Sequence, residues 1–386
     1  MRPIPSADNR RACVEAVLRR QPPPRLVYAP NYWQWFTHQR NHGLLPPEVA
    51  HCSTQLDLIR HLGLDVFSRN LYCDQHTRWF GGLADEVGDD VEKHEEVRFE
   101  GRDRVITRTY RTPRGTLAER QRHVFAETTL VQESFLLDGS PGALDAFDAL
   151  VQTRRWNFEP ARFRHWQELV GADGIVNAGE LFSPLKLLHL AAGADQAVFL
   201  LEDYPERCRE WLALHEAAQL DLVRQMLAAG VRAMISMDNL DAAFHPPRYV
   251  EQYSAGFYER ASRLCHEAGA VFFIHACGRQ RPILPLIASL GVDGLEGVAY
   301  PTLGDIELDD AMRLAGERLI VTGGISALET ERFRSADEVR RYVENLLRRL
   351  APFRHRFMLS ASCNTSIRTP WPVLQWFRDA WREFDG

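Results

Sequence analysis

The chain has 386 residues, of which 45% are hydrophobic and 25% charged, and its formal net charge is -6. This composition is typical of a globular protein with a large core. The weak negative charge gives no electrostatic reason to expect nucleic acid or an anionic membrane surface as a partner, and we expect neither. The sequence shows no signal peptide and no apolar run long enough to span a membrane, so we expect a cytoplasmic protein.

Apolar runs alternate with helical patterns along the chain, which is typical of parallel βα units. In chain order, we expect strands at residues 25–30, 64–72, 174–181, 232–238, 270–277, 292–299, 318–324 and 356–362. Stretches between them, such as residues 205–230 and 335–353, carry apolar residues three and four positions apart and are expected to be helices. Eight strands with interposed helices predict an α/β protein with a (β/α)8 TIM barrel.

One interval departs from this alternation. Between about residues 95 and 137, polar and apolar residues alternate around the sequence TPRG, which indicates antiparallel strands and a turn. We therefore expect a small antiparallel β insertion after the second strand. We also expect an N-terminal extension over about residues 1–24, within a single domain covering residues 1–386, because no repeat or long linker is visible.

The stretch AVFFIHACGRQ, residues 270–280, ends an expected strand with two metal-ligand types, His275 and Cys277. Side chains two positions apart on a strand point the same way, and the carboxyl ends of barrel strands line the active site. Cys363 follows the last expected strand and is expected at the same mouth of the barrel. One His and two Cys form a sensible zinc set with an open position, whereas the alternative is a buried thiol and a hydrogen-bonded imidazole.

Other polar or flexible residues at strand ends are further candidates. Glu180, Asp238 and Glu296 end the third, fourth and sixth strands, where each could supply an oxygen ligand or orient His275 through its second nitrogen. We take Asp238 and Glu180 as the catalytic candidates, although salt bridging at the rim is the alternative. Gly323 and Gly324 at the seventh strand are candidate cofactor-binding positions, where backbone amides could meet an anionic group.

Residues 170–380 resemble the uroporphyrinogen decarboxylase superfamily, especially its zinc-dependent branch of methylcobalamin:thiol methyltransferases of the coenzyme M type. The matching stretches are GELFSPLKLLHLAAG, HPPRYVEQYSAGFYERASRLCHEAGAVFFIHACG, GVDGLEGVAYPTLGDIEL, LIVTGGISALE and FMLSASC. The resemblance implies that His275, Cys277 and Cys363 bind zinc. It also implies a methyltransferase that moves a methyl group from a corrinoid or another activated donor to a zinc-bound thiol.

The chain departs from the decarboxylases of this superfamily in two places. Their arginine-rich and aspartate-containing substrate segments correspond here to THQRNHGLLP, residues 37–46, and VFSRNL, residues 66–71. Arg69 or Asn70 stands where an aspartate would be expected. Two alternatives to the methyltransferase remain: a decarboxylase or lyase acting on a small or tetrapyrrole carboxylate, and a non-catalytic relative that binds a tetrapyrrole.

The sequence DQHTRW, residues 74–79, begins like a corrinoid-binding loop but lacks the glycine that should follow. We therefore expect any corrinoid to arrive on a separate carrier protein or as free methylcobalamin, beside a small-molecule thiol or other methyl acceptor.

Overall fold

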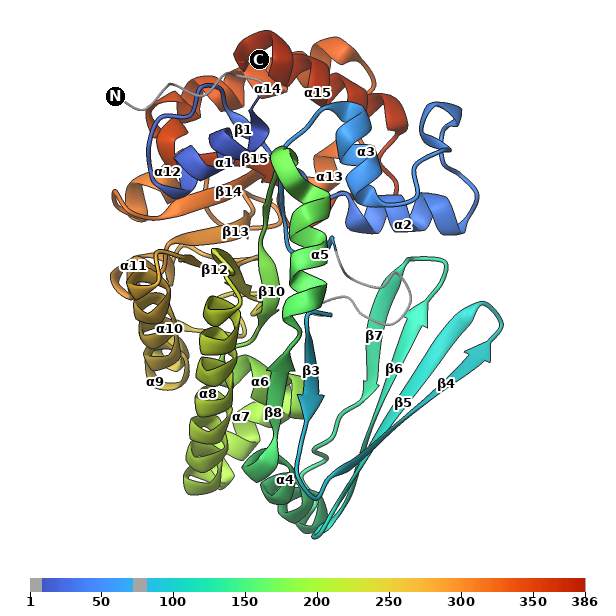
Figure 1. Ribbon diagram of the computed structural model, residues 1–386, viewed down its shortest axis with the longest axis vertical. Helices are drawn as coiled ribbons and strands as arrows, with labels where there is room; N and C mark the ends of the chain where they lie inside the picture. The colour runs from blue at the N-terminus through green and yellow to red at the C-terminus, as the bar shows by residue number, and fades with distance from the viewer. Residues whose placement is uncertain (1–8, 72–81, 386) are drawn as a thin grey trace.

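The computed structural model describes residues 9–71 and 82–385. The DQHTRW sequence and Cys73 lie outside these residues. Within the described residues, nine short parallel strands build the two parallel sheets of the fold (Figure 1). They are β1 (Val27–Tyr28), β2 (Val66–Ser68), β9 (Gly174–Val176), β10 (Ala178–Leu181), β11 (Ala233–Ser236), β12 (Val271–His275), β13 (Gly294–Val298), β14 (Ile320–Ile325) and β15 (Phe357–Ala361).

The pairing of these strands follows a ring. One sheet has the order β1-β15-β14-β13-β12-β11-β10, and β2 pairs with β9. Only Asn177 separates β9 from β10, so the two form one barrel position. The backbone N–H of Asp65, just before β2, donates to the carbonyl of Tyr28 in β1 at 2.9 Å. The expected barrel is confirmed, and each of the eight expected ranges contains or overlaps a strand.

Helices follow most strands, and most of them cover the outside of the barrel, whereas α4 (Pro141–Thr153) packs on the insertion. They are α2 (Trp33–Asn41), α3 (Gln55–Leu62), α4 (Pro141–Thr153), α5 (Pro160–Val170), α6 (Pro184–Ala192), α7 (Ala194–Asp203), α8 (Pro205–Ala228), α9 (Pro247–Tyr253), α10 (Ala255–Glu267), α11 (Leu284–Ser289), α12 (Leu308–Leu314), α13 (Ala327–Thr330), α14 (Ala336–Leu350) and α15 (Trp371–Asp385). Short 3-10 turns lie at Pro47–Val49, Gly171–Asp173 and Ala351–Arg356.

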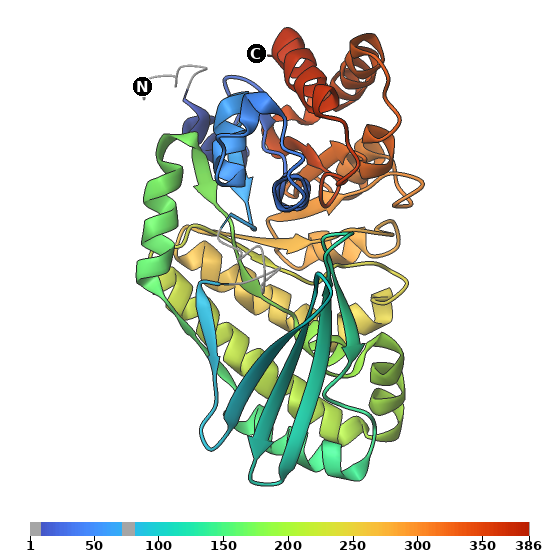
Figure 2. The ribbon, with the colours of Figure 1, turned by 90° about the vertical axis from the view of Figure 1, so that its right-hand side faces the viewer.

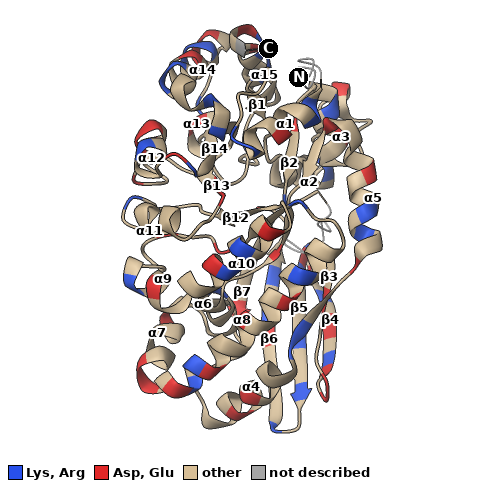
Figure 3. Cartoon of the chain, turned by 60° about the vertical axis from the view of Figure 1, so that its left-hand side comes forward, with Lys and Arg blue, Asp and Glu red and all other residues tan. Residues whose placement is uncertain are grey.

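The last long helix before β15 illustrates why these segments are helical. The side chain of Ser335 caps α14 by accepting a hydrogen bond from the backbone of Glu338. Val339, Val343, Leu346 and Leu350 are buried along one face, three and four positions apart. Charged residues of both signs lie on the outer surfaces of the helices (Figure 3). No helix of the described residues has the length and apolarity that a membrane crossing needs.

The expected insertion is an antiparallel sheet (Figure 2). Its strands are β4 (Glu92–Glu100), β5 (Asp103–Thr112), β6 (Gly115–Val124) and β7 (Thr129–Ser134). A second antiparallel pair, β3 (Ala84–Val87) with β8 (Arg155–Phe158), flanks it. Tyr110 and Leu117 of the sheet pack in a hydrophobic cluster with Leu144, Phe147 and Leu150 of α4. The insertion is thus anchored by an apolar face that the sequence pattern did not assign to a partner.

The expected N-terminal extension contains a helix, α1 (Arg10–Leu18), that packs against the barrel interior. Its buried residues Cys13, Val14 and Val17 belong to the same hydrophobic cluster as Phe273 and Met358, which point into the barrel. Because the partners of α1 lie near the amino ends of the strands, the helix closes that end of the barrel. The opposite, carboxyl end remains for a functional site.

Candidate metal centre

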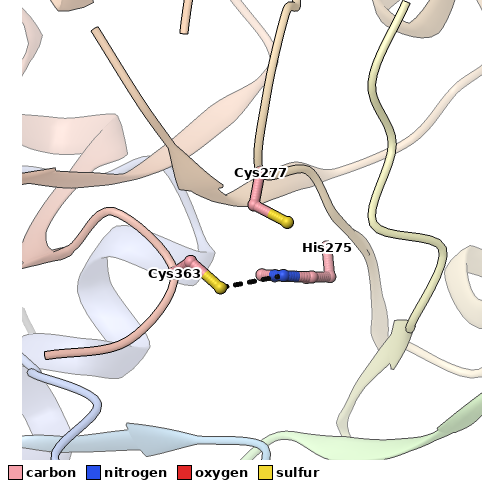
Figure 4. A group of neighbouring side chains, drawn as sticks. All are labelled: His275, Cys277 and Cys363. Carbon is pink, nitrogen blue, oxygen red and sulfur yellow. Dashed lines mark hydrogen bonds between the residues drawn. The ribbon is translucent and has the colours of Figure 1, made fainter. Parts of the chain in front are cut away.

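The three candidate ligands meet at the carboxyl end of the barrel. His275 is the last residue of β12, Cys277 lies two residues beyond it, and Cys363 lies two residues beyond the end of β15. Their ligand atoms all lie within 4.8 Å of one another, and Sγ of Cys363 lies 3.5 Å from Nε2 of His275 (Figure 4). Cys277 and Cys363 are 86 positions apart in the sequence. The ends of β12 and β15 therefore bring residues from distant parts of the chain into one cluster.

The backbone around Cys363 is held in an unusual conformation. Cys363 has a φ of +93°, in the region that favours glycine, which costs a non-glycine residue on the order of 1–3 kcal/mol. Its carbonyl accepts a hydrogen bond of 3.2 Å from Asn31 Nδ2, and Ser362 Oγ donates to the carbonyl of Val298 at 3.1 Å. Contacts with the loop after β1 and with the last residue of β13 thus fix the thiol in its place at the cluster.

The second ring nitrogen of His275 is also engaged. Nδ1 of His275 contacts Oε2 of Glu296, and Arg69 donates from Nε to that same oxygen at 2.9 Å. Burial alone would raise the pKa of Glu296, but Arg69 and His275 outweigh it and hold the pKa at about 2. The carboxylate stays ionised and fixes the imidazole with Nε2 turned toward the thiols. Glu296, rather than Glu180 or Asp238, is the acidic residue that orients His275.

The two thiols differ because they share one hydrogen bond. The bond from Cys277 lowers the pKa of Cys363 well below its usual value, and the charges of His275 and Arg69 act in the same direction against burial. The same hydrogen bond, together with burial, raises the pKa of Cys277. The cluster therefore favours one thiolate, on Cys363, which is the ionised form that a metal ion needs as a ligand.

One separation within this donor set can be compared with that of a tetrahedral zinc site. Zinc bonds of about 2.0–2.1 Å to nitrogen and about 2.3 Å to sulfur place the two donor atoms about 3.5 Å apart at a tetrahedral angle. The separation of 3.5 Å between His275 Nε2 and Cys363 Sγ matches that value. Three protein ligands also leave one tetrahedral position open for a substrate atom.

Asp238 lies at the end of β11 as expected, and its carboxylate is buried. It accepts hydrogen bonds from the backbone of Ser183 at 2.8 Å, from Ser236 Oγ at 3.0 Å and from Tyr258 Oη at 2.6 Å. Because Ser183 caps α6, these bonds tie the start of that helix to β11. The structure therefore gives Asp238 a positioning role, and its catalytic role stays a prediction.

Glu180 lies near the end of β10, the strand that pairs with β11. Its carboxylate accepts hydrogen bonds from the backbone N–H groups of Leu83 and Ala84, at 3.1 and 3.2 Å, and so holds the start of β3. Gly323 and Gly324 lie inside β14 and pair with β15, and Gly324 O accepts a hydrogen bond from Tyr342. A cofactor-binding role for these glycines and a catalytic role for Glu180 remain predictions.

A cavity of about 230 Å³ lies over the cluster. Besides the three ligands, its walls include Arg69, Asn70, Leu130, Asn239 and Asn364. A second cavity, of about 580 Å³, shares Cys277, Cys363 and Asn364 with it, and a third, of about 640 Å³, shares Leu130 and Asn239. Leu130 comes from the β insertion, so the insertion supplies part of the wall of the site, which the sequence did not predict.

Comparisons with known proteins bear on this site. A family model described as uroporphyrinogen decarboxylase (URO-D) matches residues 172–384, more than half of the chain and all three candidate ligands. Among solved structures, a methyltransferase from Methanosarcina mazei superposes with a TM-score of 0.57 at 14% identity, covering 96% of this chain and 97% of that chain. At this identity the likeness shows the fold alone.

A D-psicose 3-epimerase from Clostridium cellulolyticum H10 matches with a TM-score of 0.36 at 9% identity, covering 58% of this chain and 83% of that chain, and carries no argument. No curated protein matches the sequence.

Proposed function

The chain belongs to the uroporphyrinogen decarboxylase family, and on that premise we propose that it is a zinc-dependent methyltransferase that moves a methyl group from a corrinoid or another activated donor to a thiol. The observation that carries the proposal is the convergence of His275, Cys277 and Cys363 at the mouth of the barrel. Zinc in this set would lower the pKa of a thiol bound at its open position and keep that thiol as a nucleophilic thiolate near neutral pH.

The residues around the cluster support this chemistry. Glu296 holds His275 by Nδ1, so that Nε2 remains the donor nitrogen, and Arg69 balances the charge of Glu296 inside the barrel. The bound thiol would form its carbon–sulfur bond while the bond from the methyl carbon to the donor breaks, with the electron pair staying on the donor and the thiol proton leaving to solvent. The protein's part is to orient both reactants and to exclude water.

The position that departs from the decarboxylases also favours a metal site over porphyrinogen decarboxylation. In those enzymes this segment carries an aspartate. In this chain the segment contains Arg69, whose guanidinium donates a hydrogen bond to Glu296. Asn70 Oδ1 in turn accepts a hydrogen bond of 2.8 Å from Arg69 Nη1. The segment serves the metal cluster in this chain. The protein from Methanosarcina mazei that shares the fold over nearly the whole chain is described as a methyltransferase, which is the activity that we propose.

Metal content and methyl transfer test the proposal together. Purified protein, prepared without chelator, is expected to contain about one zinc per chain by elemental analysis. With methylcobalamin as donor and a panel of small thiols as acceptors, the cobalamin spectrum should show demethylation. Protein with no zinc, or zinc-loaded protein that demethylates the donor with none of the thiols, would contradict the proposal.

Cysteine variants separate the cluster from the rest of the fold. Cys363→Ser is expected to lose most of the bound zinc and the methyl transfer while the protein stays folded, because Cys363 lies at the rim. Cys208→Ser is the matched control: this thiol is buried in the core beneath the insertion, where Sγ donates to the carbonyl of Leu200 at 3.2 Å, and a hydroxyl can make the same bond. Equal zinc content in Cys363→Ser and Cys208→Ser would show that the third ligand is misassigned.

A further inference from the structure

The β insertion ends on one side in a long strand whose outer edge is open. The order of its sheet is β4-β5-β6-β7, so β4 and β7 are the two edge strands. β4 pairs with β5 over nine consecutive residues without a bulge, and among the described residues no other strand pairs with it. It forms the outer margin of the insertion (Figure 1). An open edge of this length offers backbone donors and acceptors to another strand.

The other edge strand shows how such pairing is commonly avoided. β7 has six residues, and its pairing with β6 is irregular between Arg120 and Gln121. Short or irregular edge strands are poor templates for a further strand. β4 is neither short nor irregular, and it contains no proline or glycine. It exposes 40% of Val97 and 70% of Phe99, more than for any other large hydrophobic side chain of the described residues in the case of Phe99.

The turn that ends β4 determines which of its residues face the open edge. A two-residue turn at residues 101–102 joins β4 to β5, and the residues on either side of it are direct partners in the ladder. Partners that flank such a turn form a hydrogen-bonded pair, and hydrogen-bonded and non-hydrogen-bonded pairs then alternate along the strands. The backbone N–H and C=O groups of Glu95, Val97 and Phe99 therefore point to the open edge.

Charge does not protect this edge, because most carboxylates of β4 are neutralised within the chain. Three of the four pair with arginines of β5 and β6: Glu92 with Arg111 at 3.3 Å, Glu95 with Arg108 at 2.7 Å and Glu100 with Arg122 at 2.6 Å. The fourth, Glu96, lies 2.8 Å from Arg98 of the same strand, and both side chains of this pair are exposed. An identical strand can therefore exchange partners with this pair.

We propose that two copies of the chain form a two-fold dimer in which β4 pairs antiparallel with β4 of the second copy, centred on Val97. In this register Glu96 of each copy lies opposite Arg98 of the other, and the two Val97 side chains face each other. Phe99 lies diagonal to Val97 of the second copy on the same face, so the exposed apolar side chains form one cluster. Centring on Glu96 or Arg98 instead would place two like charges directly opposite each other.

Sedimentation equilibrium of the full-length protein tests this dimer. A pair of nine-residue strands buries less surface than a standard interface, so we expect a weak dimer with a Kd on the order of 10 μM. Arg98→Glu and Glu96→Arg each place like charges opposite each other and should each raise the Kd at least about tenfold. Mixed in equal amounts, these two variants should form a heterodimer as stable as the wild-type dimer, because every Glu then faces an Arg.

A disulfide across the two-fold axis tests the register. The Cα atoms of two residues in a hydrogen-bonded pair are about 5.5 Å apart, which a disulfide can span. Val97→Cys should therefore give a covalent dimer on a non-reducing gel after oxidation with glutathione disulfide. Val131→Cys is the matched control, because Val131 is similarly exposed, at 44%, but lies on β7. It should give no more covalent dimer than the wild type, which carries the same native thiols.

Three results would overturn the inference. Wild-type protein that remains monomeric at several hundred micromolar would leave the edge of β4 to a strand of a different protein. A dimer that Arg98→Glu does not weaken would lie on another surface. Two charge variants that stay monomeric when mixed, or equal cross-linking of Val97→Cys and Val131→Cys, would contradict the register centred on Val97. None of these measurements depends on bound metal or on methyl transfer.

Discussion

Arg69 donates a hydrogen bond of 2.9 Å from Nε to Oε2 of Glu296, the same oxygen that contacts Nδ1 of His275. All three side chains are buried. A cation from the segment after β2, an anion from β13 and an imidazole from β12 thus form one chain of contacts that ends at the ligand nitrogen Nε2. Such outer partners fix the tautomer and the direction of a ligating histidine, so their removal should weaken the metal site without removing a ligand.

Glu296→Gln is therefore expected to lower the affinity for zinc by about 10- to 100-fold. The amide is nearly the same size but carries no charge to hold the proton on Nδ1. Competition with a chromophoric chelator measures the affinity directly. Glu180→Gln is the control, because Glu180 also ends a barrel strand but contacts the backbone of Leu83 and Ala84. Identical affinities in the two variants would show that Glu296 does not support the metal site.

Arg69→Met should destabilise the fold itself. The Arg69–Glu296 pair has side-chain exposures of only 2% and 7%, and removing one partner of a buried pair leaves the other charge uncompensated. We expect a loss of about 3–5 kcal/mol in the free energy of unfolding, measured with urea in the presence of chelator so that bound metal does not contribute. The double variant Arg69→Met/Glu296→Met should lose less than Arg69→Met alone. A larger loss in the double variant would contradict this account.

The sequence was sufficient for the parts of the molecule that local pattern determines. Apolar runs of six to nine residues located the barrel strands, and the position of His275, Cys277 and Cys363 at strand ends followed from the barrel's geometry. Pattern did not show which acidic residue faces His275. Glu296 does so because His275 and Glu296 are direct partners in the register of β12 and β13, and register between strands depends on packing across the whole barrel.

The contacts of the insertion and of Asp238 were also beyond the sequence. Leu130 reaches the cavity over the cluster only because the sheet is anchored on α4, a contact between segments that no local periodicity reports. Asp238 reads as a catalytic carboxylate from its place after a strand. Its three hydrogen bonds come from residues up to 55 positions away and tie β11 to the start of α6, while its catalytic role stays a prediction.

Acid should weaken the protein through Glu86. Burial would raise its pKa, but Arg154 and Lys93 lower it from the ordinary value of 4.5 to about 2. Because the folded state then binds fewer protons than the unfolded state between these two values, this contribution to stability is fully present above about pH 4.5 and is lost as the pH falls toward 2. The shift corresponds to a contribution on the order of 3 kcal/mol.

Urea unfolding between pH 6 and pH 3 measures this effect. Glu86→Gln should be less stable at pH 6 and should lose less of its remaining stability on acidification than the wild type. Asp89→Asn is the control, because Asp89 pairs with Arg155 in full contact with solvent, where the interaction is screened. Its pH dependence should follow the wild type. Parallel curves for Glu86→Gln and wild type would contradict the prediction.

A single methyl group added to β13 should disturb both the barrel and the metal site. A Cβ at Gly294 would lie 2.2 Å from Cε1 of Phe273, a buried ring that packs edge-on against Phe67 with centroids 5.2 Å apart. We expect Gly294→Ala to lower the free energy of unfolding by about 1–3 kcal/mol, because the ring has no free space to move into. Phe273 and Gly294 are register partners two residues before His275 and Glu296, so zinc affinity should fall as well.

Phe273→Leu in the same chain should restore part of the stability lost in Gly294→Ala, because the shorter side chain makes room for the new methyl group. Gly142→Ala is the matched control: no heavy atom lies within 4 Å of its added Cβ, and alanine is favoured over glycine in a helix such as α4 by up to about 1 kcal/mol. Thermal unfolding and chelator competition on the four proteins check both effects. If Gly294→Ala has the same unfolding temperature and the same zinc affinity as the wild type, the contact between β12 and β13 does not position His275.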